Sequence, residues 1–93
     1  MKVMCPVKHI VMRNVEVSRD KCTETKGCMI RTKEDCEIDT LILNDIYASE
    51  MESFLKADCG AIHSVYINNA ICENVTKGMV SQEGARIEFI KEV

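Results

Sequence analysis

The sequence predicts an all-β protein, a short right-handed parallel β-helix of about four coils that forms one domain over residues 1–93. The first observation is a repeat: Ile38–Ala48 returns 24 residues later as Ile62–Cys72, and Val7–Val17 fits the same template. The second is the alternation of apolar and polar residues within each copy, which is the period of a β-strand. Repeats of about 20 to 50 residues are typical of units that bury their apolar faces only by stacking.

Each copy is predicted to form two strands joined by a bend. The alternation slips by one position at equivalent places, where Asn14, Asp45 and Asn69 share a column. Asn and Asp tolerate left-handed backbone conformations and bond to their own backbone, so this column is predicted to be a ladder of turns. Five apolar columns follow from the alignment: Val7/Ile38/Ile62, Ile10/Leu41/Val65, Met12/Leu43/Ile67, Val15/Ile46/Ala70 and Val17/Ala48/Cys72.

The rest of each repeat is predicted to hold a third short strand and a turn that leads back to the first. The third apolar patches are Met29-Ile30, Phe54-Leu55 and Met79-Val80, and the return turns are Asp35-Cys36, Cys59-Gly60 and Glu83-Gly84. The last segment, Ile87–Val93, is predicted to close the stack with a register shifted by about two residues. Four coils at a spacing of ~4.8 Å give a height of roughly 20 Å.

One segment favours a different fold. Ser49–Ala57 contains good helix formers and a Ser-x-x-Glu-like start that is typical of a helix N-terminus. A helix there would make the protein a small α+β domain, which we keep as the alternative. The agreement of the columns over three copies favours the β-helix.

Composition excludes several classes of partner. The net charge is −3, and Lys and Arg are spread among Asp and Glu, so no basic patch points to nucleic acid. No run approaches the ~18 apolar residues of a membrane-spanning helix. Met1–Pro6 is too short and polar for a signal peptide. The expectation by default is a cytoplasmic protein or a fragment of a larger one, without membrane contact.

The six cysteines are interpreted as reduced thiols of the interior. Cys5, Cys36 and Cys59 are aligned in one column just before the first strand of successive coils, where small apolar side chains are needed. No C-x-x-C pair of the kind that binds zinc occurs, so we expect neither a metal nor a cofactor. If any pair forms a disulfide, Cys22 and Cys28 in the one long loop are the candidates.

Other polar residues are interpreted as ordinary surface groups. His9 and His63 lie in adjacent polar columns, and neither has a Ser or carboxylate beside it in the sequence arrangement of a triad. Glu50 and Glu52 lie in a turn between strands and are interpreted as solubilising charges. No pair of carboxylates is placed across a cleft as glycoside hydrolysis requires.

Arg31 and Lys33 are the candidate binding residues. Alternation points Cys28, Ile30 and Thr32 inward, which leaves the two cations side by side on an exposed strand face. Arg binds carboxylates with a planar fork and Lys adds a point charge, so the pair suits an acidic sugar. The alternative is a charged surface in which the cations pair with the neighbouring Glu34 and Asp35.

The segment Val7–Lys33 reads V-x-x-I-x-M-R-N-V, then a loop, then G-x-x-I-R-T-K. This order resembles the polygalacturonase family of glycoside hydrolases, and so does the next coil up to Asp58. The resemblance implies a right-handed parallel β-helix of the pectin-lyase-like class that acts on polygalacturonate. It also implies that Arg31 and Lys33 match the family's Arg and Lys, which hold the substrate carboxylate.

The departures from the family bear on activity. Its catalytic aspartates occur in N-T-D and D-D motifs and its His in G-H-G, and none of these motifs is present. The sequence therefore predicts a non-catalytic module that binds acidic polysaccharide. The alternative is a polygalacturonase-like hydrolase completed by a partner chain. Because the two ends of a short stack expose strand edges and apolar columns, we also expect a homo-oligomer joined through these ends.

Overall fold

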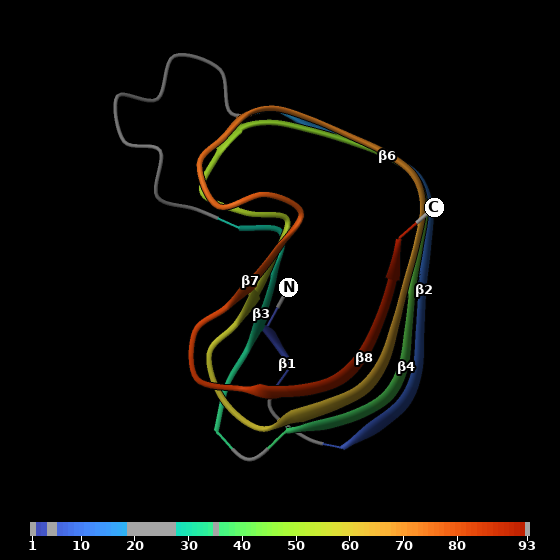
Figure 1. Cartoon of the computed structure of the whole chain (residues 1–93), viewed down its shortest axis with the longest axis vertical. Coiled ribbons are helices and arrows are strands. Elements are labelled where there is room, and N and C mark those ends of the chain that lie inside the picture. The colour runs from blue at the N-terminus through green and yellow to red at the C-terminus, as the bar shows by residue number, and fades with distance from the viewer. Residues whose placement is uncertain (1, 4–5, 19–27, 35, 93) are drawn as a thin grey trace.

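The computed structural model describes residues 2–3, 6–18, 28–34 and 36–92. Within these ranges every regular element is a strand, and the parallel strands stack as a β-solenoid of about three turns. One sheet has the order β1-β3-β5-β7 and the other β2-β4-β6-β8. Figure 1 looks down the stack, with the long strands along one side and the short strands along the other. The strands are β1 Lys2–Val3, β2 Val7–Ser18, β3 Ile30–Thr32, β4 Glu37–Met51, β5 Leu55–Ala57, β6 Ala61–Val75, β7 Val80–Gln82 and β8 Arg86–Glu92.

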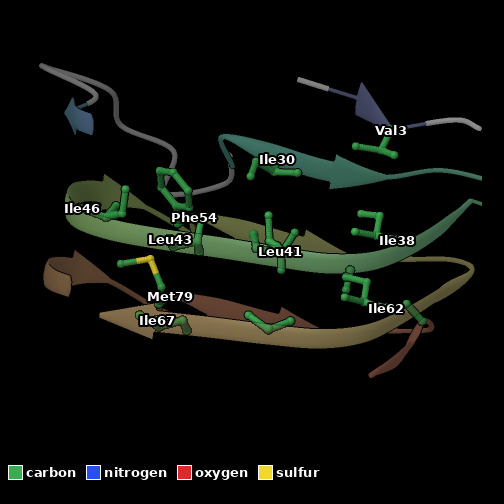
Figure 2. Close-up of a cluster of buried hydrophobic side chains, with 14 of the residues drawn as sticks. Val3, Ile30, Ile38, Leu41, Leu43, Ile46, Phe54, Ile62, Ile67 and Met79 are labelled. Carbon is green, nitrogen blue, oxygen red and sulfur yellow. The ribbon is translucent and has the colours of Figure 1, made fainter. Parts of the chain in front are cut away.

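The five predicted apolar columns are confirmed. All of their members pair in register between β2, β4 and β6, from Val7 with Ile38 to Ala48 with Cys72. The middle members are sealed from solvent, as Leu41 and Leu43 show with no exposed surface. Figure 2 shows these side chains packed between the two sheets. The apolar core therefore follows the axis of the solenoid, and the coils above and below bury each side chain.

The predicted ladder of turns is also confirmed. Asn14, Asp45 and Asn69 all have a φ of 54°, and the Asn69 side-chain amide donates to Asp45 Oδ1 at 2.7 Å. The pairing continues through the bend, so the two predicted strands form one long strand in each coil. Glu50 and Asn74 form a second left-handed bend that the sequence analysis did not predict. These two corners turn the long sheet around the core.

The third apolar patches form the short sheet, as predicted. Ile30 pairs with Leu55, and Leu55 pairs with Val80. The α+β alternative is wrong, because Met51 ends a long strand and Leu55–Ala57 is a short strand instead of a helix. The pattern of burial supplies the reason: Leu55 and Ala57 are fully buried on either side of the half-buried Lys56, which is the two-residue period of a strand. Among the described residues no helix is long and apolar enough to cross a bilayer.

The return turns differ in length, so the predicted column of Cys5, Cys36 and Cys59 is wrong at Cys59. The pairing of Glu37 with Ala61 places Cys36 opposite Gly60, so Cys59 precedes the predicted position by one residue. Cys36 is buried and its thiol donates to the Cys59 carbonyl oxygen at 3.7 Å, while Cys59 itself is half-buried. Cys5 lies outside the described residues.

Two further predictions concern the Cys22–Cys28 pair and the register of the last strand. The Cys28 thiol is free, while its candidate partner Cys22 lies outside the described residues. Ile62 pairs with Ile87, a spacing of 25 residues against 24 in the preceding coil, so the last register shifts by one residue and not by about two. The additional residue lies in the turn between Val75 and Val80.

Two glycines provide a matched test of this packing. Gly60 has a φ of 84°, and a Cβ there would lie 2.0 Å from the Cys36 carbonyl oxygen. Gly78 has a φ of 77° but no atom within 4 Å of an added Cβ. We predict that Gly60→Ala lowers the free energy of unfolding by about 2–5 kcal/mol, because backbone strain and steric overlap add.

Gly78→Ala carries the backbone strain alone and should cost about 1–2 kcal/mol. Denaturant unfolding of the two variants measures the difference. Equal losses in both variants would contradict the close approach of the coils at Gly60.

Candidate functional site

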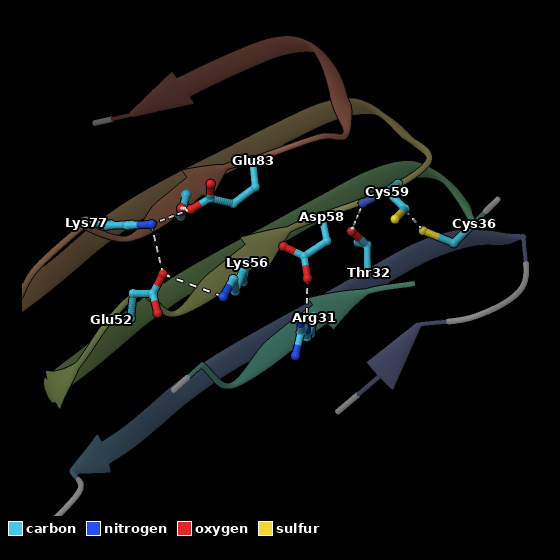
Figure 3. Close-up of polar contacts among 10 residues, drawn as sticks. Arg31, Thr32, Cys36, Glu52, Lys56, Asp58, Cys59, Lys77 and Glu83 are labelled. Carbon is cyan, nitrogen blue, oxygen red and sulfur yellow. Dashed lines mark hydrogen bonds and ion pairs between the residues drawn. The ribbon is translucent and has the colours of Figure 1, made fainter. Parts of the chain in front are cut away.

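Arg31 lies on the outer face of the short sheet, as alternation predicted. Its neighbours Ile30 and Thr32 are fully buried, while the Arg31 side chain is 39% exposed. Its Nε donates to Asp58 Oδ2 in the next coil (Figure 3). This hydrogen bond and the charge of Asp58 raise the pKa of Arg31, whereas partial burial opposes the rise. The guanidinium is therefore already in contact with the carboxylate of Asp58, a partner that the sequence did not suggest. Of the suggested neighbours, Glu34 forms no ion pair with the described residues, and Asp35 lies outside them.

Lys33 occupies a different environment from Arg31. It follows the end of β3, and its backbone N–H donates to the Val3 carbonyl at 2.8 Å. Its side chain is half-buried and forms no ion pair with the described residues. The two candidate binding residues thus lie on and just after β3, and among the described residues Arg31 has an ionic partner whereas Lys33 has none.

A second group of charges lies beside the pair of Arg31 and Asp58. Glu52 is buried, with its side chain only 11% exposed, and its Oε1 lies 3.0 Å from Lys77 Nζ and 3.6 Å from Lys56 Nζ. Lys77 also contacts Glu83 at 2.6 Å. The hydrogen bond from Lys77 lowers the pKa of Glu52 against the opposing effect of burial, and Lys56 adds to the lowering.

This placement corrects the interpretation of Glu52 as a solubilising charge of a turn. Figure 3 shows that Glu52 points toward lysines from two successive coils. A buried carboxylate is retained at low cost only when cations and hydrogen bonds compensate it. Glu52 therefore joins the coils, and it is not available as an acid or base to a ligand in solution.

His63 belongs to a group of charges on the outer face of the long sheet. Its Nε2 lies 2.7 Å from Glu37 Oε1 and 3.9 Å from Asp39 Oδ1, and its Nδ1 lies 2.9 Å from Glu88 Oε2. The hydrogen bonds to Glu37 and Glu88 raise the pKa of His63 to about 9. His63 is thus positively charged at neutral pH and joins three strands of the long sheet, which corrects its interpretation as a solvated surface residue.

The same group is the one place among the described residues where three ligand atoms gather for a metal ion. One atom each from Glu37, Asp39 and His63 lies within 4.8 Å of the others. A protonated His63 accounts for the convergence of the carboxylates without an ion, because it neutralises them directly. The arrangement is therefore described as an ion-pair network.

The C-terminal end of the stack is open. The pairs between β6 and β8 end at Ile67 with Glu92, so no described strand covers the outer edge of β6 beyond that point. A hollow of about 470 Å³ lies there, lined by core-facing side chains that include Ala70, Cys72 and Met79. On β8, Ile90 continues the column of Leu41 and Val65 and remains 45% exposed. This end therefore presents a core-facing apolar side chain of the kind that is buried in the middle coils.

The N-terminal end is open in the same way. Along β2 the core-facing side chains are only half-buried, whereas their register partners on β4 are almost completely buried. The half-buried residues are Val7, Ile10, Met12, Val15 and Val17. The outer edge of β2 has no strand partner among the described residues. Both ends of the solenoid thus combine a free strand edge with an incomplete apolar core.

In comparisons with known proteins, no family model, no curated protein and no solved structure matches this chain. The parallel solenoid is shown by the structure itself. A link to the polygalacturonase family is not supported beyond the resemblance of the strand patterns.

The His63 network leads to a prediction on pH. The pKa of His63 is raised from its ordinary 6.5 to about 9, so its stabilising contribution is complete below pH 6.5 and is lost as the pH rises through about 9. We predict that His63→Gln lowers the melting temperature at pH 6 and has a much smaller effect at pH 10. Calorimetry at both pH values measures this difference.

His9→Gln is the control, since His9 is exposed on the same sheet and forms no ion pair with the described residues. A loss of stability in His63→Gln that is the same at pH 6 and pH 10 would show that the charge of His63 does not join the coils.

Proposed function

We propose that this β-solenoid is a non-catalytic module that associates with further copies of itself through its open ends. The observation that carries the proposal is the contrast within each apolar column. Leu41 has no exposed surface, whereas Ile10 at one end and Ile90 at the other belong to the same column and remain accessible. A neighbouring coil buries the middle residue, and only another coil-like surface would bury the two terminal ones.

The free strand edges support the same proposal. β2 is a 12-residue edge strand, and an edge of this length presents a row of unpaired N–H and C=O groups that favours pairing with another strand. The core-facing residues Ile10 and Met12 lie on this strand and are only half-buried. Association would satisfy the backbone groups and remove this apolar surface from water in one step.

A second copy is the occupant that fits best. The ends are built from the same columns, so the side chains of one copy repeat at the spacing that the other requires. The molecule measures 34 × 26 × 17 Å, and the shortest dimension is the axis of the stack (Figure 1). An end face of 34 by 26 Å has an area similar to the roughly 800 Å² that each partner buries in a stable interface.

We further propose acidic polysaccharide as a ligand of the outer face of the short sheet, with Arg31 and Lys33 as contacts. The supporting observation is a cationic column, because Lys2, Arg31 and Lys56 are register partners on successive strands. Asp58 already binds Arg31 as a carboxylate within the chain, so a uronate would compete with it. Hydrolysis is not part of the proposal, because the acidic motifs of the family are absent from the sequence.

Self-association is tested by replacing an apolar residue of the open end. Ile90→Lys places a charge on a column that must become buried in the assembly, and we predict a dissociation constant at least about tenfold higher, or roughly 1.4 kcal/mol. Light scattering over a dilution series measures the mass. Circular dichroism verifies that the variant keeps its strand content.

Ile71→Lys is the matched control. Ile71 is 52% exposed, but its register partner Tyr47 places it on the outward side of the long sheet and not in the core. The control should associate like the original protein. A protein that remains monomeric at high concentration, or an Ile90→Lys variant that associates normally, would contradict the proposed function.

Binding of acidic polysaccharide is tested through the competing carboxylate. Asp58→Asn releases the Arg31 guanidinium, and we predict that polygalacturonate oligomers then bind more tightly, whereas Arg31→Ala binds about tenfold more weakly. Isothermal titration calorimetry measures both. Lys91→Ala, an exposed lysine on β8, is the control and should leave binding unchanged. Equal affinity in all variants would contradict a role for Arg31.

A further inference from the structure

We infer that the copies join head to tail, with β2 of one copy placed in register on β8 of the next, so that the assembly is an open-ended filament. The inference rests on the proposed self-association and adds its direction and register. Two observations carry it: an alternation of charge along one outer column, and the match of the apolar columns at the two ends.

The charged column contains Lys8, Asp39, His63 and Glu88, one from each of the four strands of the long sheet. Each occupies the position after a member of the first apolar column, in which Val7, Ile38, Ile62 and Ile87 pair in series. His63 is charged at neutral pH and contacts Glu88 at 2.9 Å. The sign therefore alternates from coil to coil, and the column ends with an anion at the C-terminal end and begins with a cation at the N-terminal end.

A parallel continuation of the stack preserves this alternation. The strand that follows β8 should carry a cation beside Glu88, and β2 of a second copy supplies Lys8 at that position. Opposite charges in neighbouring positions of a sheet stabilise it, whereas like charges destabilise it. Glu88 would then lie between His63 of its own copy and Lys8 of the next one.

The apolar columns match in the same register. When Lys8 lies beside Glu88, Val7 of the incoming copy lies on Ile87 and Ile10 lies on Ile90. Both Ile87 and Ile90 are core-facing positions that are accessible in the single copy. This places β-branched side chains on one another, as Ile38 and Ile62 already are within the chain.

The second half of β2 would extend over the hollow at the end of β6. In this register Met12 lies on Glu92, which continues the third column on β8. Val15 and Val17 project toward the core from β2 and are half-buried in the single copy. No strand of the described residues fills the layer between them and Ala70 or Cys72. The junction is therefore tight along β8 and looser beside the hollow.

Head-to-head and tail-to-tail arrangements lose the matches of charge and of apolar columns. Two N-terminal ends would bring together β2 strands that carry Lys8 and Arg13 against one acidic residue, Glu16. Joining two equivalent ends also reverses the strand direction, so the bends of the long sheets would not superpose on one another. Figure 1 shows that the contour of a coil is asymmetric, with a long bent side and a short one. A head-to-tail contact leaves one free end of each kind at every stage, so the assembly can keep growing and does not close.

Zero-length carbodiimide cross-linking of the unaltered protein tests the direction. Copies labelled with ¹⁵N are mixed with unlabelled copies, treated with the reagent and digested for mass spectrometry. Within one copy three strand spacings of ~4.8 Å, or about 14 Å, separate Lys8 from Glu88, which is too far for an amide bond. We expect mixed-label peptides that join Lys8 to Glu88, and a ladder of cross-linked species beyond the dimer.

Each other result has a definite meaning. Oligomers whose mixed-label cross-links join Lys8 to Glu16, or Lys91 to Glu88, would show head-to-head or tail-to-tail contacts and overturn the inference while self-association stands. A protein that remains monomeric would overturn both.

Charge variants provide a second measurement. Glu88→Gln should weaken association about threefold to tenfold, and the double reversal Lys8→Glu with Glu88→Lys should associate better than either single reversal. Glu73→Gln is the control, because Glu73 lies on β6 outside the charged column. This variant should associate like the original protein. Equal association of the single and double reversals would contradict the contact between Lys8 and Glu88.

Discussion

The structure depends on one constraint, the in-register stacking of core-facing side chains from successive coils. Ile38, Leu41 and Leu43 are buried because β2 and β6 cover them on both sides. A single coil encloses too little apolar surface to offset the entropy lost on ordering its residues. Stability therefore arises between coils, and each coil must hold the same path around the axis for the columns to align.

The corners maintain that path. Asp45 and Asn69 adopt the same left-handed conformation and bond to each other, so the bend repeats at one place on the contour. At the return turn, Gly60 approaches the Cys36 carbonyl more closely than any side chain would allow. Successive coils differ in length by one residue: Ile38 and Ile62 are 24 residues apart, and Ile62 and Ile87 are 25 apart. The additional residue is accommodated in a turn between strands. The columns remain aligned while the turn lengths vary.

Much of this architecture follows from the sequence, because columns and turn residues repeat at a nearly constant spacing. The five apolar columns and the Asn/Asp ladder were predicted correctly for this reason. Contacts between positions that are not aligned could not be predicted in the same way. Arg31 aligns with Lys56 but bonds to Asp58, two residues further along, and Glu52 reaches Lys77 across a turn. Such contacts depend on side-chain reach and turn length, which the repeat does not specify.

The distribution of charge separates the sides of the solenoid from its ends. On the sides, Arg31, Glu52 and His63 all have partners of opposite charge in neighbouring coils. At the ends, the same columns stop at residues whose next neighbour is missing, both for apolar groups and for the alternating charges. The repeat that stabilises the middle of the stack thus stops at each end without a neighbour. The association that we propose would continue there the packing that folds the chain.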